Sequence, residues 1–330
     1  MSGFVHWVFS KRTIPNGVWE RTIKIMKILY LGSFNKSLTD STEKHIKYAL
    51  EQLGHQVVAV DEDRFKNFNS NEFNENRADI ELLNNNDADL FLFHKGAVGD
   101  YIGLDLLVKI LTYLTCPKVC WYFDKVFPDR EEYIEYVSAY SNYVFLTDET
   151  FIKRHKFNNL YPLRQGIGNE DTSLGKYREE YDCDVAFMGN PYHGREGFVR
   201  DLQAKYGERF KIIDDAFNRD LYDACASAKI VVAPPYPSDE FYWSSRFYLT
   251  LGSGGFLVHP ELYGLKEEGW VEGMHYAGYK SNQEFFDTID YYLAHEKERK
   301  AIQQEGYKRC ISEFTYKDRV EEMLRKVCLK

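Results

Sequence analysis

Hydrophobic residues in the first half of the chain occur in short continuous runs, separated by polar or glycine-bearing segments. These runs predict buried strands at 27–31, 57–60, 90–93, 119–123 and 143–146. Three of the intervening segments space their apolar residues three or four positions apart, which is typical of a helix with one buried face. Apolar strands that alternate with helices predict a parallel sheet covered on both sides. The first half is therefore expected to be an α/β domain.

The second half repeats this alternation after an interruption. Its main predicted strands lie at 185–188, 210–213, 230–233 and 256–258. The interruption, Tyr161-Pro-Leu-Arg-Gln-Gly-Ile-Gly168, combines proline with glycine and predicts a hinge between two domains. We therefore expect four parts: an N-terminal extension (1–25), an N-terminal Rossmann-like domain (26–165), a C-terminal Rossmann-like domain (166–315) and an amphipathic C-terminal helix (316–330).

Length and composition fit two domains. A chain of 330 residues, 44% of them hydrophobic, can bury two separate cores. No apolar run reaches the roughly 18 residues of a membrane span. Residues 1–25 are basic but lack the apolar core of a secretory signal. The six cysteines form no Cys-x-x-Cys pair. We therefore expect buried free thiols in a reducing cytoplasm.

Charge and motifs argue against several functional classes. The net charge of −9 counts against a large nonspecific nucleic-acid surface, although a local basic cleft is compatible with it. The chain has no P-loop, no His-Glu-x-x-His and no Gly-x-Ser-x-Gly motif. Its Asp87-Ala-Asp89 element precedes a strand rather than following one. We therefore expect neither a cofactor nor a catalytic divalent metal.

Ligands in open α/β sheets bind beyond the carboxyl ends of the strands, and this rule selects candidate site residues. In the first half these are Gly32 with Ser33, His94 with Lys95 and Gly96, and Asp124 with Lys125. Asp124 could accept a proton from a substrate hydroxyl or cap the following turn. His94 could be a general base or a histidine packed at the edge of the sheet. Gly189, Asn190 and the loop 236–246 are the corresponding candidates in the second half.

The segment 230–259 carries the most specific pattern. An apolar strand leads through a polar loop to Ser244 and Ser245, followed by Arg246, a short helix, the glycine cluster 252–255 and a second strand. This βαβ order would gather a helix start, two capping serines and a guanidinium into one volume that suits a phosphate. Alternatively, Arg246 could have a purely structural role, as part of an ion pair that holds the loop.

Arg195 follows the Gly189 loop and offers a second guanidinium for phosphate oxygens, unless it is only a surface residue at a helix start. His193 and Arg200 are further candidates beside it.

Several of these motifs resemble a known family. Ser245-Arg246-Phe247, the glycine cluster, Gly273-x-His275-x-x-x-Tyr279 and Tyr291-Tyr-Leu293 are similar to the C-terminal half of GT-B glycosyltransferases, in the subgroup of spore-maturation glycosyltransferase-like proteins. The resemblance covers about residues 183–320 well and 26–165 more loosely. It implies two Rossmann-like domains facing a central cleft, and a terminal helix that crosses back to the first domain.

The resemblance also implies a function. A nucleotide-diphosphate sugar of the UDP or GDP type would bind the C-terminal domain, and an unidentified acceptor would bind the N-terminal domain. The sugar would be transferred with retention and without a metal. Retaining GT-B enzymes often carry two glutamates eight residues apart, the first at the donor sugar and the second at the ribose. Here Glu240 matches the first, but Tyr248 stands at the second and offers only a neutral hydrogen bond.

Other functions stay open at this point. A GT-B nucleotide-sugar epimerase would need carboxylates clustered at the sugar and no acceptor pocket. A noncatalytic nucleotide-sugar binding module would fit the replacement of a glutamate by Tyr248. Phage enzymes of related architecture glycosylate modified DNA bases, and such an acceptor is a minority alternative that the acidic net charge disfavours.

Overall fold

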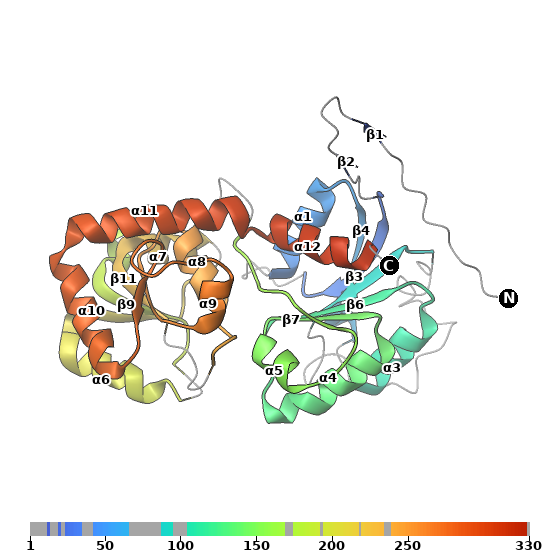
Figure 1. Ribbon diagram of the computed structural model, residues 1–330, viewed down its shortest axis with the longest axis horizontal. Coiled ribbons are helices and arrows are strands. Elements are labelled where there is room, and N and C mark those ends of the chain that lie inside the picture. Colours follow the sequence, from blue (N-terminus) through green and yellow to red (C-terminus); the bar gives the residue numbers. More distant parts are fainter. Residues whose placement is uncertain are drawn as a thin grey trace.

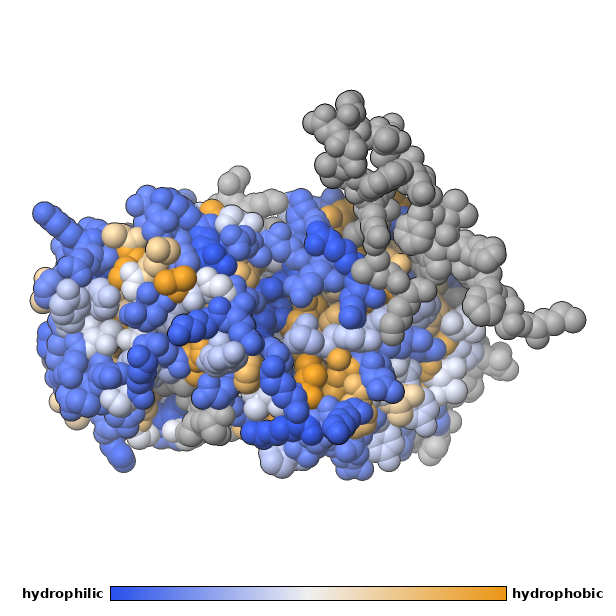
Figure 2. Space-filling model, in the orientation of Figure 1, coloured by the Kyte–Doolittle hydropathy of each residue, from blue (hydrophilic) through white to orange (hydrophobic). Residues whose placement is uncertain are grey.

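The computed structural model describes residues 12–13, 19–20, 24–34, 42–65, 87–94, 104–168, 174–191, 194–217, 219–233 and 239–328. Two α/β domains lie side by side (Figure 1). A short antiparallel pair, β1 (Arg12–Thr13) and β2 (Trp19–Glu20), precedes them. Polar residues cover most of the face seen in Figure 2, with apolar residues in scattered patches. Within the described ranges, no helix is long and apolar enough to cross a membrane.

A six-stranded parallel sheet forms the centre of the N-terminal domain, in the order β4-β3-β5-β6-β7-β8. Its strands are β3 (Lys27–Gly32), β4 (Gln56–Asp61), β5 (Leu90–Phe93), β6 (Lys118–Tyr122), β7 (Tyr143–Leu146) and β8 (Leu160–Pro162). The five strands predicted from the apolar runs are confirmed. β8 was not predicted, because its three residues fall where the proline and glycine signals begin.

Both faces of this sheet are buried, as continuous apolar runs require. Successive side chains of a strand point to opposite faces. Leu90 and Leu92 therefore pack beneath α1 (Thr42–Gln52) and α12 (Tyr316–Cys328). Phe91 and Phe93 face the other layer. The helices of that layer are α3 (Leu104–Tyr113), α4 (Pro128–Tyr140) and α5 (Glu149–Arg154).

The C-terminal domain holds a five-stranded parallel sheet in the order β10-β9-β11-β12-β13. Its strands are β9 (Cys183–Met188), β10 (Phe210–Ile213), β11 (Ala228–Val232), β12 (Leu257–Pro260) and β13 (Ala277–Tyr279). Its helices are α6 (Glu196–Tyr206), α7 (Arg219–Ser227), α8 (Arg246–Gly252), α9 (Tyr263–Glu267), α10 (Asn282–Ala294) and α11 (Glu296–Glu313). In both sheets the strand order reverses next to the first strand, where open α/β sheets bind ligands.

The chain passes between the domains twice, and the two connections are hydrogen-bonded to each other. The backbone N–H of Ile167 donates to the carbonyl of Phe314 at 2.9 Å, and the N–H of Tyr316 donates to the carbonyl of Ile167 at 2.9 Å. After the second connection, α12 lies on the N-terminal domain (Figure 1), where Val320 and Met323 join its core. The relative position of the domains therefore depends on this crossing.

The crossing generates a stability prediction. A Cβ added to Gly166 would lie 2.7 Å from the Phe314 carbonyl oxygen and 2.9 Å from the carbonyl carbon of Thr315. Because both are backbone atoms, one connection must move. We expect Gly166→Ala to lower the free energy of unfolding by about 1–3 kcal/mol, the usual cost of overpacking, as measured by urea denaturation.

Gly197→Ala is the matched control. Its added Cβ would approach only the end of the Arg200 side chain, at 3.8 Å. Gly197 lies in α6, and alanine has the higher helix propensity, so this variant should be as stable as the wild type or more so. If Gly166→Ala behaved in the same way, the two connections would not be closely packed.

Candidate functional site

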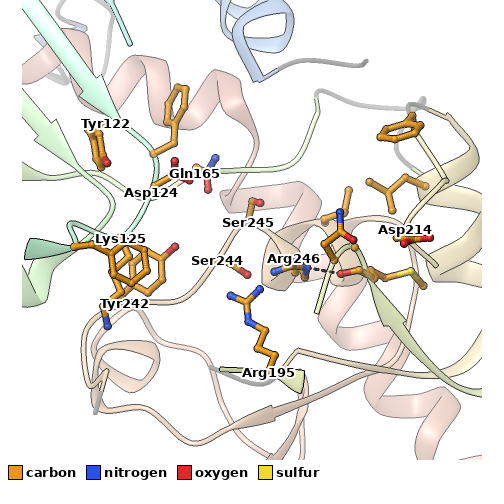
Figure 3. A pocket seen from close by; sticks show the side chains of 18 of the residues that line it. Tyr122, Asp124, Lys125, Gln165, Arg195, Asp214, Tyr242, Ser244, Ser245 and Arg246 are labelled. Atoms are coloured by element: carbon orange, nitrogen blue, oxygen red, sulfur yellow. Dashed lines mark hydrogen bonds between the residues drawn. The ribbon is translucent and has the colours of Figure 1, made fainter. Parts of the chain in front are cut away.

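A cavity of about 960 Å³ lies between the two domains (Figure 3). Its size is within the roughly 300–1,000 Å³ range of small-molecule sites. The carboxyl ends of β6, β9 and β10 and the start of α4 form its walls, together with the segment before α8. The charged residues that line it are Asp124, Lys125, Asp129 and Arg130 from the N-terminal domain and Arg195, Asp214 and Arg246 from the C-terminal domain.

Arg246 is fixed against the end of β9. Its Nε donates a hydrogen bond to the carbonyl of Met188 at 2.6 Å. The next residue, Gly189, has φ of 86°, and a Cβ there would lie 2.8 Å from Nη2 of Arg246. Glycine is therefore required twice, for the left-handed backbone and for the close approach of the guanidinium. Gly189, Asn190 and Arg246 all line the cavity.

Arg195 lies on the same side of the cavity, at the residue before α6. In Figure 3 its guanidinium points into the cavity on the side of Ser244 and Arg246. Two guanidinium groups at one wall repel each other unless an anion lies between them. This wall therefore suits a group with several anionic oxygens.

Ser244 and Ser245 line the cavity, but they do not cap α8 as expected. Ser245 has helical dihedrals, φ −52° and ψ −22°, and its side chain makes no capping hydrogen bond. The helix begins at Arg246 and has only seven residues. The hydroxyls are therefore not used as helix caps, which corrects the sequence-based prediction.

Asp124 stands on the opposite wall, directly after β6 (Figure 3). The neighbouring Lys125 forms an ion pair with Asp239 of the C-terminal domain. Asp239 is only 4% exposed, and burial raises the pKa of its carboxyl group while Lys125 acts in the opposite direction. This ion pair joins the two domains next to Asp124.

His94 does not line the cavity, and its expected role as a base needs correction. The side chain is buried, with Nδ1 3.1 Å from the Trp121 carbonyl oxygen and Nε2 in contact with the Tyr30 hydroxyl. Because a carbonyl can only accept, Nδ1 carries the proton and Nε2 accepts from Tyr30. Burial lowers the pKa of His94 to about 3, so the ring is neutral at pH 7. The histidine packs the edge of the sheet.

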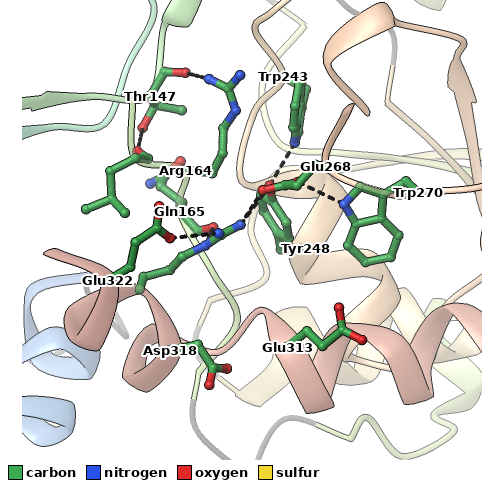
Figure 4. Close-up of polar contacts among 12 residues, drawn as sticks. Thr147, Arg164, Gln165, Trp243, Tyr248, Glu268, Trp270, Glu313, Asp318 and Glu322 are labelled. Atoms are coloured by element: carbon green, nitrogen blue, oxygen red, sulfur yellow. Dashed lines mark hydrogen bonds and ion pairs between the residues drawn. The ribbon is translucent and has the colours of Figure 1, made fainter. Parts of the chain in front are cut away.

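Tyr248 is buried outside the cavity, so its expected contact with a ribose also needs correction (Figure 4). Its hydroxyl donates to Glu268 at 2.7 Å and accepts from Trp243 at 3.1 Å and from Arg319 at 3.2 Å. Burial, reinforced by the Glu268 carboxylate, raises the pKa of Tyr248 well above its usual value. The phenol therefore stays protonated and serves as a structural hydrogen-bonding group.

Tyr248 belongs to a set of contacts between the domains that we name the hinge network: Gln165, Tyr248, Glu268 and Arg319. Arg319 of α12 donates to Glu268 at 2.6 Å and to the carbonyl of Gln165 at 3.2 Å. Glu268 also accepts from the indole of Trp270 at 2.8 Å. Gln165 lines the cavity, so the hinge network reaches the edge of the site.

The remaining candidates are not brought to the cavity or lie beyond the described residues. Glu240 is exposed and outside the lining, so the structure does not place it at a donor sugar. Arg200 is exposed on α6 at a separate surface pocket. Gly32 and Ser33 are also outside the lining. Lys95, Gly96 and His193 lie outside the described residues.

Comparison with known proteins identifies the fold and a family match over the C-terminal part of the chain. Residues 173–325 match the family described as glycosyl transferase-like. The match covers the C-terminal domain and most of α12. With the two-domain architecture, the match makes the protein a GT-B glycosyltransferase. The narrower spore-maturation subgroup stays a prediction. No curated protein sequence matches the chain.

Solved structures of low sequence identity share the fold over nearly the whole glycosyltransferase. HepE from Anabaena in complex with UDP-glucose is 13% identical, with a TM-score of 0.59 and coverage of 91% of this chain and 100% of that chain. An α-glucosyltransferase in complex with UDP and a 13-mer DNA is 11% identical, with a TM-score of 0.61 and coverage of 91% and 100%. Sucrose-phosphate synthase from Thermosynechococcus elongatus is 9% identical, with a TM-score of 0.59 and coverage of 91% and 98%. The predicted GT-B architecture is confirmed.

Sequence reasoning missed several residues that line the glycosyltransferase cavity. Asp214 directly follows β10, so the rule of the carboxyl ends could have found it. Phe217 follows three residues later in the same loop. Gln165 and Arg130 carried no comparable signal, because only the crossing of the chain and the direction of α4 bring them to the cavity.

The described part of the chain offers cationic side chains rather than metal ligands at the site. No group of three or more His, Cys, Asp or Glu among those residues could hold a metal ion. All six cysteines are free thiols. The cationic residues of the cavity wall are Lys125, Arg130, Arg195 and Arg246. They can contact an anionic ligand directly.

The buried histidine predicts how stability depends on pH. The pKa of His94 is about 3 in the folded glycosyltransferase and 6.5 in an unfolded chain. Between these values the unfolded state binds more protons, so the free energy of unfolding falls as pH falls below 6.5, by about 1.4 kcal/mol per pH unit for this group. The stability change between pH 7 and pH 5 should be smaller in His94→Asn by about 2 kcal/mol, measured by urea denaturation at each pH.

Comparing the slopes of the free energy of unfolding against pH removes the pH-independent change in stability that the substitution itself causes. A wild-type slope in His94→Asn would contradict a buried, neutral His94.

Proposed function

We propose that this glycosyltransferase moves a sugar from a nucleotide-diphosphate sugar to an acceptor hydroxyl. The observation that carries the proposal is the cavity between the domains, where Arg195 and Arg246 face Asp124 across the cleft. Guanidinium groups suit a diphosphate, and a carboxylate suits a hydroxyl that must lose its proton. The two walls therefore fit the two substrates of a transfer reaction.

The donor lies on the C-terminal wall in this proposal. Gly189 and Asn190 let the main chain approach the diphosphate, while Ser244 and Ser245 offer hydroxyl groups. The hydrogen bond from Arg246 to Met188 holds the guanidinium in place before the ligand arrives. A charge fixed in this way stabilises the departing diphosphate without reorganisation in the transition state.

The acceptor lies on the N-terminal wall, at Asp124. The acceptor oxygen forms a bond to the anomeric carbon on the face from which the diphosphate departs, and the bond from that carbon to the diphosphate oxygen breaks, leaving its electron pair on the diphosphate. The acceptor proton passes to Asp124. Holding both substrates in one cleft supplies the orientation, and the two walls limit access of water.

We further propose that the anomeric configuration is retained and that no metal takes part. Retention rests on the similarity to retaining GT-B enzymes. The metal-free mechanism is supported by the cationic side chains of the cavity, which can neutralise the diphosphate themselves. NMR of the product would test the first point, and transfer in the presence of a chelator would test the second.

The geometry of the cavity favours a transferase over a binding module or an epimerase. The binding-module alternative depended on Tyr248, which is buried in the hinge network. A nucleotide-sugar epimerase would convert the donor into a different sugar, and chromatography of the incubated donor would reveal it.

A DNA acceptor is not favoured by the N-terminal wall. Two acids, Asp124 and Asp129, line it beside Arg130 and Lys125. Lys125 is already paired with Asp239.

Replacing Arg246 tests the donor side. We expect Arg246→Ala to lower kcat/KM for the donor by about 10²–10³-fold, the usual effect of losing one preorganised charge contact. Arg200→Ala removes an exposed arginine outside the cavity and should leave the kinetics unchanged. Equal kinetics for the two variants, with both folded, would refute the role of Arg246.

Replacing Asp124 tests the acceptor side. Asp124→Asn keeps the shape and removes the charge, so transfer should fall by about 10²–10⁴-fold while donor affinity stays unchanged. Glu240→Gln neutralises an exposed acid outside the cavity and serves as the control. Full activity of Asp124→Asn with a lower melting temperature would reduce Asp124 to a structural role.

A further inference from the structure

The cavity wall at the end of β10 differs chemically from the wall around Arg246. Its apolar lining residues are Ile213, Ala216, Phe217 and Leu221. Among the described residues that line this part, Asp214 is the charged one. A diphosphate would be repelled here, whereas a flat, mainly apolar group with hydrogen-bond donors on its edge would fit.

Sheet pairing places Asp214 directly beside the proposed diphosphate site. Ile213 of β10 is in register with Met188 of β9, and the Gly189 N–H donates to the Ile213 carbonyl at 2.7 Å. Asp214 therefore lies next to Gly189, on the side of the edge strand β10, at about the 4.8 Å spacing of neighbouring strands. A ligand with its diphosphate at Arg246 can extend its nucleoside toward Asp214.

The Asp214 carboxylate is available to a ligand. The residue is exposed, and no hydrogen bond or ion pair joins its side chain to any of the described residues. The ring of Phe217, also on the cavity wall, is 51% exposed. An exposed ring of this kind can stack on a heterocyclic base and bury apolar area. The two side chains offer an acceptor for the edge of a base and a surface for its face.

We propose that the nucleotide of the donor is a guanosine diphosphate, with Asp214 accepting hydrogen bonds from guanine and Phe217 packing on its ring. The inference rests on the proposed function and specifies the donor. A carboxylate has two oxygens that only accept. Guanine presents two adjacent donors, N1–H and the 2-amino group, which match both oxygens in a charge-assisted pair.

The other common bases match Asp214 less well. Uracil places its N3–H between two carbonyl oxygens, which a carboxylate repels. Adenine and cytosine each place an amino group beside a ring nitrogen that accepts hydrogen bonds. Each offers a single donor next to at least one repelled acceptor, so the Asp214 carboxylate discriminates in favour of guanine.

Isothermal titration calorimetry of the 330-residue chain with GDP, IDP, UDP and ADP tests the proposal. IDP is informative because it lacks only the 2-amino group. We expect GDP to bind about tenfold or more tightly than UDP, and IDP to lie between them, since each charge-assisted hydrogen bond changes affinity by about tenfold. Asp214→Asn should lose most of the preference for GDP over IDP.

Two further variants separate the contributions. Asp215→Asn neutralises the next acid along the chain, which is exposed and does not line the cavity, and it should bind like the wild type. Phe217→Leu keeps an apolar side chain but removes the ring. It should weaken GDP and IDP by a similar factor and leave their ratio unchanged.

The outcomes distinguish this inference from the proposed function. If UDP bound as tightly as GDP, or if Asp214→Asn kept the wild-type preference, guanine recognition by Asp214 would be overturned while nucleotide binding stood. If no nucleoside diphosphate bound at millimolar concentration, both proposals would fail.

Discussion

The arrangement of the two domains depends on one partly buried ion pair, between Arg319 and Glu268. Their side chains are 8% and 17% exposed, and Nη2 and Oε1 are 2.6 Å apart. Removing such charges from water is costly, so each needs the other and further hydrogen bonds. Tyr248 and Trp270 donate to Glu268, and Arg319 donates to the Gln165 carbonyl. Loss of one partner would leave an uncompensated charge, at a cost of about 3–5 kcal/mol.

This ion pair affects the shape of the cavity because Arg319 is held by the N-terminal domain and Glu268 belongs to the C-terminal domain. Arg319 is on α12, whose apolar residues lie in the core of the N-terminal domain. Glu268 follows α9 in the C-terminal domain. The ion pair and the crossing at Ile167 therefore hold the carboxyl ends of the two sheets opposite each other. The Lys125–Asp239 ion pair is a further contact between the domains, next to Asp124. A two-substrate cleft needs such a frame, since small displacements of either wall would separate the reacting groups.

The parts of the cavity wall differ in charge, and so in the ligand groups that they attract. Arg195 and Arg246 make one part of the C-terminal wall attractive to anions, and Asp214 makes the neighbouring part repulsive to them. Asp124 places a carboxylate, which can accept a proton, on the opposite wall. A ligand with a diphosphate and a donor-rich base can therefore lie along the C-terminal wall in one direction only. Preorganised contacts such as the hydrogen bond from Arg246 to Met188 give this polarity a fixed geometry.

The sequence by itself determined the alternation of strands and helices, the two parallel sheets, the position of Gly189 and Asp124 just after strands, and the position of Arg195 and Arg246 at helix starts. Apolar runs and the carboxyl-end rule are local properties, so they can be read from neighbouring residues. Tertiary structure decided the rest. His94 and Tyr248 are polar residues at plausible positions, yet long-range partners, Tyr30 for one and Arg319 for the other, bury them away from the cavity. Gln165 reaches the cavity only because the two connections between the domains cross. Contacts between residues far apart in sequence leave no local pattern. Only the folded structure therefore distinguishes the residues that line the cavity from those that hold the two domains together.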